Sequence, residues 1–137
     1  MTHATGVERV AAAGNVVALG LDVVDVDRIR EALARTPTLV DRVYTPDEIA
    51  YCREARDPSE RFAVRWAAKE AVVKTLGGGV PGIDLRGIAV RREPNGAPTI
   101  ELTDRAAELA AERGYRSWLV SLSHTSTVAQ AVVAALA

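Results

Sequence analysis

The chain has 137 residues, of which 48% are hydrophobic, and a formal net charge of −1. That length can bury the core of one domain, and the near-neutral charge gives no general attraction to nucleic acid or to an anionic membrane. No apolar run is long enough to span a bilayer, the first fifteen residues hold no apolar signal segment, and Cys52 is the only cysteine. We therefore expect a cytoplasmic protein without disulfides or membrane contact, in which any anion site is local.

The first part of the chain predicts a tail and a strand. Residues 1–15 are rich in alanine, glycine and threonine but have no period, so we predict a mobile tail or a mis-assigned start before a single domain over residues 16–137. Val16–Val24 alternates in hydrophobicity and predicts a strand. One face of that strand contains Gly20 and Asp22. An acid beside a glycine at a strand end is either a helix cap or a ligand.

Two helices are predicted to follow this strand. The first is Arg28–Arg35, and Asp25 or Asp27 is better placed than Asp22 to cap it. Asp22 is therefore left without an obvious structural role. The second helix starts at Thr45, where the sequence T-P-D-E combines a capping box with a proline at the first helical position.

A central helix is predicted over Phe62–Leu76, between the starting sequence D-P-S-E and the glycines 77–79 that end it. It is apolar on most sides, which predicts burial. Charges on a buried helix are costly unless they are paired, hydrogen-bonded or bound to a ligand. At about 100° per residue, the four charges form two strips: Glu70 with Lys74, and Arg65 with Lys69. The structural interpretation is an ion pair between Glu70 and Lys74 that stabilises the helix by a few tenths of a kcal/mol, roughly.

The C-terminal half predicts a hairpin, a helix with one apolar stripe, and two further strands. In chain order these are the strands Gly87–Arg92 and Thr99–Leu102, a helix capped by Thr103 or Asp104 that runs to Arg113, and the strands Trp118–Leu122 and Val128–Leu136. The last two strands are joined by the residues S-H-T-S-T at 123–127, which are either a turn that satisfies its own backbone or donors for a ligand. The elements together predict one α+β domain with a mostly antiparallel sheet packed with helices.

Three segments along the chain each hold polar residues among apolar ones. They are G-L-D at 20–22, W-A-A-K-E-A-V-V-K at 66–74 and S-L-S-H-T at 121–125. In this combination the chain resembles the holo-acyl-carrier-protein synthase type of 4′-phosphopantetheinyl transferase, whose motifs are G-x-D, F/W-x-x-K-E-x-x-x-K and S-x-S-H-S/T. The resemblance spans about Val17 to Val133. Each motif alone is weak, whereas the ordered set is specific.

Three differences from other family members bear on this resemblance. The N-terminal tail is longer than usual, and Gly78 occupies a position where many members have threonine, which removes one hydroxyl from the glycine loop. The longer, two-lobed transferases usually carry G-x-D-x-E, but here Val24 replaces the second acid. This favours the short class, which assembles as a homotrimer with active sites between subunits.

The resemblance implies that the protein transfers 4′-phosphopantetheine from coenzyme A to a serine of an apo acyl carrier protein and releases adenosine 3′,5′-bisphosphate. It thereby implies a role in fatty acid or polyketide biosynthesis. By the same resemblance, Asp22 and Glu70 hold Mg²⁺, which often takes only one or two carboxylates, and Lys74 reaches the phosphates. The base that deprotonates the serine is either Glu70 or a metal-bound water or hydroxide.

The remaining site residues follow from the resemblance too. Ser123, His124 and Thr125 are expected to bind the 3′-phosphate of coenzyme A from a neighbouring subunit. Lys69 either helps at the phosphates or pairs structurally, and Gly77 belongs to a loop that can approach the ligand closely. Arg28 is expected to meet the acidic helix of a carrier protein, together with Arg35; Arg65 is a weaker candidate for the phosphates. The alternative function is a non-catalytic module that binds coenzyme A or a carrier protein on the same fold.

Overall fold

A computed structural model of the protein describes residues 15–78 and 81–137, so the tail predicted over residues 1–15 lies outside the described residues except for its last one. Within the described ranges the fold is α+β, as predicted. In chain order the elements are β1 (Val16–Asp25), α2 (Val26–Arg35), α3 (Leu39–Val43), α4 (Pro46–Arg53), α5 (Pro58–Thr75), the 3-10 helix η1 (Leu85–Gly87), β2 (Ile88–Arg92), β3 (Pro98–Leu102), α6 (Asp104–Glu112), β4 (Ser117–His124) and β5 (Val128–Leu136). No helix in these ranges has the length and apolarity needed to cross a bilayer.

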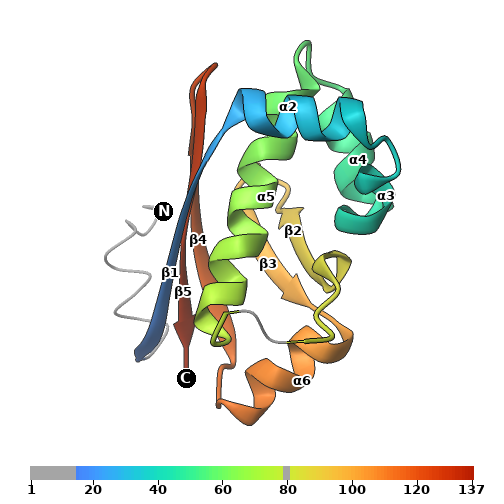
Figure 1. Ribbon diagram of the computed structural model, residues 1–137. Coiled ribbons are helices and arrows are strands. Elements are labelled where there is room, and N and C mark those ends of the chain that lie inside the picture. Colours follow the sequence, from blue (N-terminus) through green and yellow to red (C-terminus); the bar gives the residue numbers. More distant parts are fainter. Residues whose placement is uncertain (1–14, 79–80) are drawn as a thin grey trace.

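The strands form two antiparallel sheets, where one sheet was predicted. The larger sheet has the order β1-β5-β4, and the smaller is the hairpin β2-β3. The long helix α5 lies in the middle of the molecule (Figure 1), packs against β1 and β5 and also contacts α2, α4 and β2. Because α5 contacts elements from both ends of the chain, its side chains can share sites with residues far away in sequence.

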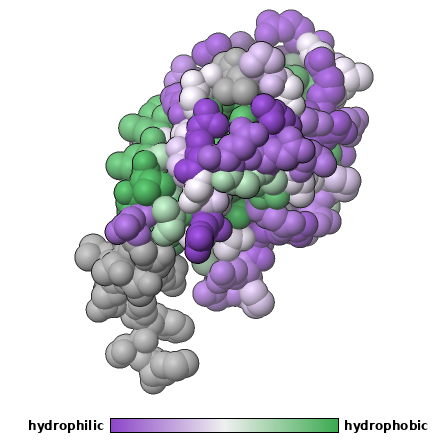
Figure 2. All heavy atoms as spheres, turned by 90° about the horizontal axis from the view of Figure 1, so that it is seen from below, coloured by the Kyte–Doolittle hydropathy of each residue, from purple (hydrophilic) through white to green (hydrophobic). Residues whose placement is uncertain are grey.

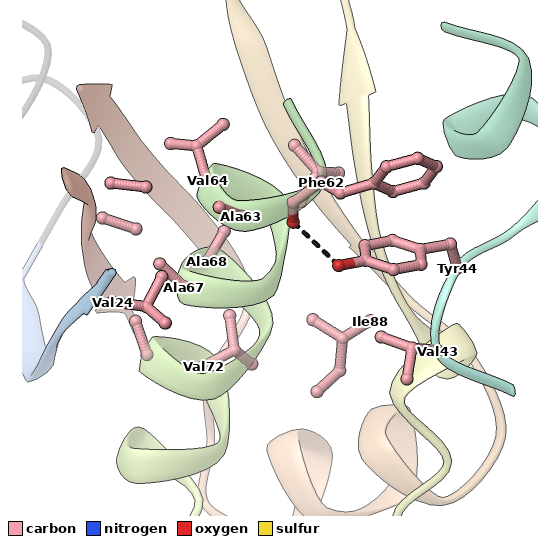
Figure 3. Close-up of a cluster of buried hydrophobic side chains, with 14 of the residues drawn as sticks. Val24, Val43, Tyr44, Phe62, Ala63, Val64, Ala67, Ala68, Val72 and Ile88 are labelled. Atoms are coloured by element: carbon pink, nitrogen blue, oxygen red, sulfur yellow. Dashed lines mark hydrogen bonds between the residues drawn. The ribbon is translucent and has the colours of Figure 1, made fainter. Parts of the chain in front are cut away.

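The core fills the space between α5 and its neighbours. One group of core side chains comes from α5 itself and from β1, α3 and β2 (Figure 3). Tyr44 is buried among them, where its ring lies 4.7 Å from that of Phe62 and its hydroxyl donates a 2.8 Å hydrogen bond to the Phe62 carbonyl. A buried hydroxyl is costly without such a partner. This contact fixes the chain that leads into α4 against the start of α5.

Glycine at position 20 allows β1 to approach α5 closely. A Cβ atom built at Gly20 would lie 2.0 Å from the backbone oxygen of Ala71, a distance that no side chain can tolerate. On a strand, residues two apart share a face, so Asp22 follows Gly20 on the side of the sheet that faces α5. The glycine of the G-x-D motif thus brings its acid to the helix.

Two helix ends, the start of α4 and the end of α5, agree with the prediction from the sequence. At α4 the side chain of Thr45 accepts from the Glu48 backbone while Glu48 accepts from the Thr45 backbone, which is the predicted capping box. At the end of α5 the backbone of Gly77 has φ 105°, a value that favours glycine. The Gly78 backbone then donates to the Val73 carbonyl, and the Gly77 backbone to that of Lys74. This is the hydrogen-bond pattern of a Schellman motif.

Other boundaries differ from the prediction. The helix expected from Arg28 begins at Val26, and Asp25 holds its cap position without a side-chain hydrogen bond. Thr103 likewise precedes α6 without one. The short helices α3 and η1 were not predicted. Ser123 and His124, predicted to lie in a junction, belong to β4, because they pair in register with Gln130 and Ala129 of β5.

Candidate active site

Two carboxylates and a lysine meet where β1 crosses α5. Asp22 from β1 and Glu70 from α5 line one hollow of about 490 Å³, together with Trp66, Arg28 and Arg35. The hollow therefore combines an acidic pair with two arginines from the neighbouring helix α2. Three predicted site residues, Asp22, Glu70 and Arg28, are brought together here, although 48 positions separate the first two.

Lys74 pairs with Asp22, and not with Glu70 as the structural interpretation of the sequence suggested. Its ammonium donates 2.7 Å to the Leu21 carbonyl and 3.0 Å to Asp22 Oδ1. The Lys74 side chain is 52% exposed, while that of Asp22 is only 18% exposed. Asp22 thus has a partner that the sequence did not reveal, but the partner lies at the surface and can turn towards a ligand.

The pKa of Glu70 is raised above its ordinary value. Burial is the main cause and the neighbouring charge of Asp22 is the second, while the positive charge of Lys74 acts in the opposite direction. The two carboxylates repel each other in this half-buried hollow, and a bound cation would reduce that repulsion. Mg²⁺ binds hard oxygen ligands and often takes only one or two carboxylates, so Asp22 and Glu70 fit this ion. The described residues contain no group of three or more histidine, cysteine or acidic side chains that could hold a metal ion.

A second hollow of about 490 Å³ lies beside the first turns of α5. His124 lines it, as do the guanidinium-bearing residues Arg61, Arg65 and Arg92 and the ring of Tyr51. No acidic residue is among its lining residues. A concave surface with three arginines and a histidine attracts anions, and arginine is suited to bind phosphate through paired hydrogen bonds.

His124 also lies near a carboxylate outside the hollow lining. Its Nδ1 atom is 3.4 Å from Glu60 Oε1, an ion pair whenever the imidazole is protonated. Thr125 caps the turn between β4 and β5, because its hydroxyl oxygen accepts from the Thr127 and Val128 backbones at 3.2 and 3.0 Å. This matches the turn interpretation of the sequence. Ser123 lies on the opposite face of β4 from His124 and lines neither of these two hollows, so its role stays a prediction, as does that of Gly77.

The structure corrects the expectation that Lys69 contacts the phosphates. Its side chain is 0% exposed, and its ammonium donates to Glu48 Oε1 at 2.8 Å and to the carbonyls of Leu85 and Ile88 at 2.9 and 2.7 Å. An ammonium has three donors, so none is left for a ligand. Burial lowers the pKa of Lys69, and the charge of Glu48 opposes that shift. Lys69 is therefore a structural residue, the second of the two roles considered.

Three members of the arginine-lined hollow were not identified from the sequence. Arg61 precedes Arg65 by one helical turn, and this spacing is a signal that could have placed both on one strip of α5. Tyr51 and Arg92 come from α4 and β2. Nothing in their local sequence connects them to α5, so only the tertiary structure identifies them.

The chain is similar to known proteins of one family. Residues 18–135 match the family described as the 4′-phosphopantetheinyl transferase superfamily. The holo-acyl-carrier-protein synthase of Moorella thermoacetica is 42% identical, over 82% of this chain and 88% of that protein. The structure of the Helicobacter pylori holo-acyl-carrier-protein synthase in complex with coenzyme A has a TM-score of 0.75 and 29% identity, over 86% of this chain and 99% of that one.

The Neisseria meningitidis holo-acyl-carrier-protein synthase has a TM-score of 0.80 and 26% identity, over 90% of this chain and 100% of that one. The family match covers residues 18–135, which include all three motifs and both hollows. The protein thus belongs to the 4′-phosphopantetheinyl transferase superfamily.

Proposed function

We propose that this protein moves the 4′-phosphopantetheine group of coenzyme A to a serine of an apo acyl carrier protein in the cytoplasm, and that Asp22, Glu70 and Lys74 form its catalytic centre. The observation that carries the proposal is the meeting of two carboxylates, Asp22 and Glu70, in one hollow, with the Lys74 ammonium bonded to Asp22. A non-catalytic binding module would not need this costly arrangement. The test is the mass of an apo carrier protein after incubation with the enzyme, coenzyme A and Mg²⁺.

In the proposed reaction the serine oxygen bonds to the phosphorus that carries pantetheine, and the pyrophosphate bond breaks. Adenosine 3′,5′-bisphosphate leaves, and the serine proton passes to a base. Bound Mg²⁺, held by Asp22 and Glu70, would supply positive charge at the pyrophosphate oxygens. Lys74 would supply a second positive charge there after leaving Asp22. Glu70 lies in this hollow and is the proposed proton acceptor.

The arginine-lined hollow is the proposed site for the 3′-phosphate of coenzyme A. The strongest support for this role comes from Arg65. It is only 5% exposed, and no carboxylate pairs with it among the described residues. The one hydrogen bond that its side chain makes in the described part of the chain, to the Arg61 carbonyl, is 3.5 Å long. A nearly buried charge without a counter-ion is costly, and a phosphate would provide that counter-ion.

The two hollows share no lining residue within one chain, which favours a site composed of two subunits. An apolar surface suited to an interface lies on the larger sheet. Figure 2 shows hydrophobic residues gathered on the left of the molecule, the side where β1 and β5 lie in Figure 1. The large exposed apolar residues are Val16, Val17, Leu19, Leu21, Val23, Val128 and Val132, with Leu19 69% exposed. Contiguous apolar patches mark association surfaces, and the family resemblance supports a homotrimer.

The composite site predicts complementation between inactive subunits. Glu70→Ala removes one half of the site and His124→Ala the other, so each homotrimer should be inactive. After subunits have exchanged, mixed trimers contain some intact sites, and a fraction of the wild-type activity should return. The measurement is the transfer rate before and after exchange, with the trimer confirmed by sedimentation. A monomer at micromolar concentration, or no recovery after proven exchange, contradicts the composite site.

Arg28 is the proposed contact for the carrier protein. It is exposed on α2, lines the catalytic hollow and has no ion-pair partner among the described residues. Arg35, the last residue of the same helix, lines the same hollow. Two free guanidinium groups beside the catalytic carboxylates suit an acidic carrier helix that must deliver its serine to Glu70.

Arg28→Glu should therefore raise the KM for the carrier protein about tenfold or more, since like charges then meet at the contact, and leave the KM for coenzyme A nearly unchanged. Rising salt should reduce the wild-type rate at low carrier concentration, because salt screens the attraction. Arg113→Glu, at the exposed end of α6, makes the same charge change away from the hollow and serves as the control. A folded Arg28→Glu protein with the wild-type carrier KM removes Arg28 from the docking surface.

A further inference from the structure

Tyr51 has an unusual position within the arginine-lined hollow. The central guanidinium carbons of Arg61, Arg65 and Arg92 lie 4.0, 4.4 and 4.2 Å from the centre of its ring. All three distances are within the range of a cation–π contact. The three arginines come from two elements, α5 and β2, whereas Tyr51 comes from a third, α4. One aromatic ring thus contacts every arginine of the hollow.

Among the described residues, the three guanidinium groups have few carboxylate partners. Within the described ranges, the only ion pair of Arg61 is a 4.0 Å contact to Glu54, whose side chain is 71% exposed. Arg65 and Arg92 have no carboxylate partner among the described residues. Like charges gathered at one place repel one another. The ring of Tyr51 opposes this, because its negative face attracts each cation.

Tyr51 is itself held firmly. Arg61 donates a 2.6 Å hydrogen bond to the Tyr51 carbonyl, in addition to its contact with the ring. One turn earlier in α4, the Glu48 carboxylate accepts from Lys69 of α5 at 2.8 Å and from the Val90 backbone of β2 at 2.9 Å. The elements that carry the arginines are thereby joined to the helix that carries the ring.

We propose that Tyr51 is a positioning residue, whose ring holds Arg61, Arg65 and Arg92 in the arrangement that binds the phosphate monoester of a nucleotide. The inference rests on the proposed function of this hollow as the site of the 3′-phosphate of coenzyme A. It assigns to Tyr51 an effect on the affinity for that phosphate, exerted through the arginines and not through a contact with the ligand.

The test compares variants that keep or remove the ring. Tyr51→Leu removes the ring and should raise the KM for coenzyme A about tenfold, the effect expected when several cation–π contacts are lost, while kcat at saturating coenzyme A changes less than about twofold. The KM for coenzyme A that lacks its 3′-phosphate should hardly change. Tyr51→Phe keeps the ring and should have the wild-type KM for coenzyme A. If Tyr51→Leu does not fold at the assay temperature, Tyr51→Met repeats the test with a flexible side chain.

Other outcomes overturn the inference in distinguishable ways. An unchanged KM in Tyr51→Leu shows that the ring does not position the arginines. An equal rise with both forms of coenzyme A, or a rise in Tyr51→Phe, shows that Tyr51 contacts the ligand directly. Arg65→Met tests the underlying proposal separately: if it leaves the preference for the 3′-phosphate intact, the hollow is not the phosphate site, and the role of Tyr51 fails with it.

Discussion

Replacing Glu70 with glutamine should lower kcat by a factor of about 10² to 10⁴, the range expected when a group that holds or transfers a proton at the reacting centre is lost. Asp22→Asn should have an effect of similar size, because an amide is a weaker ligand for Mg²⁺ than a carboxylate. Both changes preserve side-chain shape. Glu70 has no hydrogen-bonded partner that a glutamine would lose among the described residues, so the fold should persist. The measurements are kcat at saturating substrates and thermal unfolding.

A dependence on Mg²⁺ separates the loss of a ligand from a general loss of structure. In Asp22→Asn the Mg²⁺ concentration for half-maximal rate should rise, and high Mg²⁺ should recover part of the activity. The control is Glu112→Gln on α6, an exposed carboxylate that lines neither hollow. If Glu70→Gln or Asp22→Asn keeps the wild-type rate at limiting Mg²⁺, that residue is not a ligand.

Glu48→Gln should reduce the free energy of unfolding by about 3–5 kcal/mol, because it leaves the ammonium of Lys69 buried without a counter-charge. A domain of this kind has only about 5–15 kcal/mol of stability in total, so the variant would be near its limit. The carboxylate of Glu48 also accepts from the backbones of Thr45 and Val90, at 2.8 and 2.9 Å. Its two oxygens therefore connect α4, α5 and β2. Urea unfolding measures the change.

A double-mutant cycle tests whether the two charges act as a pair. Lys69→Met alone should also be strongly destabilising, since it leaves the charge of Glu48 buried. The double variant Glu48→Gln with Lys69→Met should lose less than the sum of the single changes. Glu108→Gln breaks the exposed contact with Arg105 and should change stability by less than about 1 kcal/mol. Additive losses in the cycle would show that the buried pair is not coupled.

The meeting of Asp22 and Glu70 in one hollow could be expected from the family resemblance, because both residues occur in its motifs. Gly20 and Asp22 are two apart on a strand, and Glu70 and Lys74 are four apart on a helix, so each pair shares a face in any correct assignment. What joins the two pairs is the crossing of β1 over α5, which the glycine permits. The sequence did not reveal that Lys74 bonds to Asp22, because that contact depends on the crossing.

Lys69 shows why the remainder of the site could not be predicted. It lies next to Glu70 in the sequence, yet α5 turns it by about 100° into the core, where Glu48 from α4 neutralises it. Whether a charged residue on a buried helix faces a ligand or another charge depends on partners that are distant in sequence. The gathering of Arg92 and Arg65 around Tyr51 has the same origin, because no local pattern indicates which side of α5 the hairpin covers.

The central claim, that this chain catalyses phosphopantetheine transfer at Asp22 and Glu70, is tested most directly by the mass of the carrier protein. The wild-type protein is incubated with coenzyme A, Mg²⁺ and apo carrier proteins from fatty acid, polyketide and peptide synthases. We expect at least one carrier to gain the mass of a single phosphopantetheine group on its serine, with equal release of adenosine 3′,5′-bisphosphate, and Glu70→Gln to give little gain in the same time. Carrier proteins that bind but keep their mass, or an equal gain with Glu70→Gln, would contradict the account.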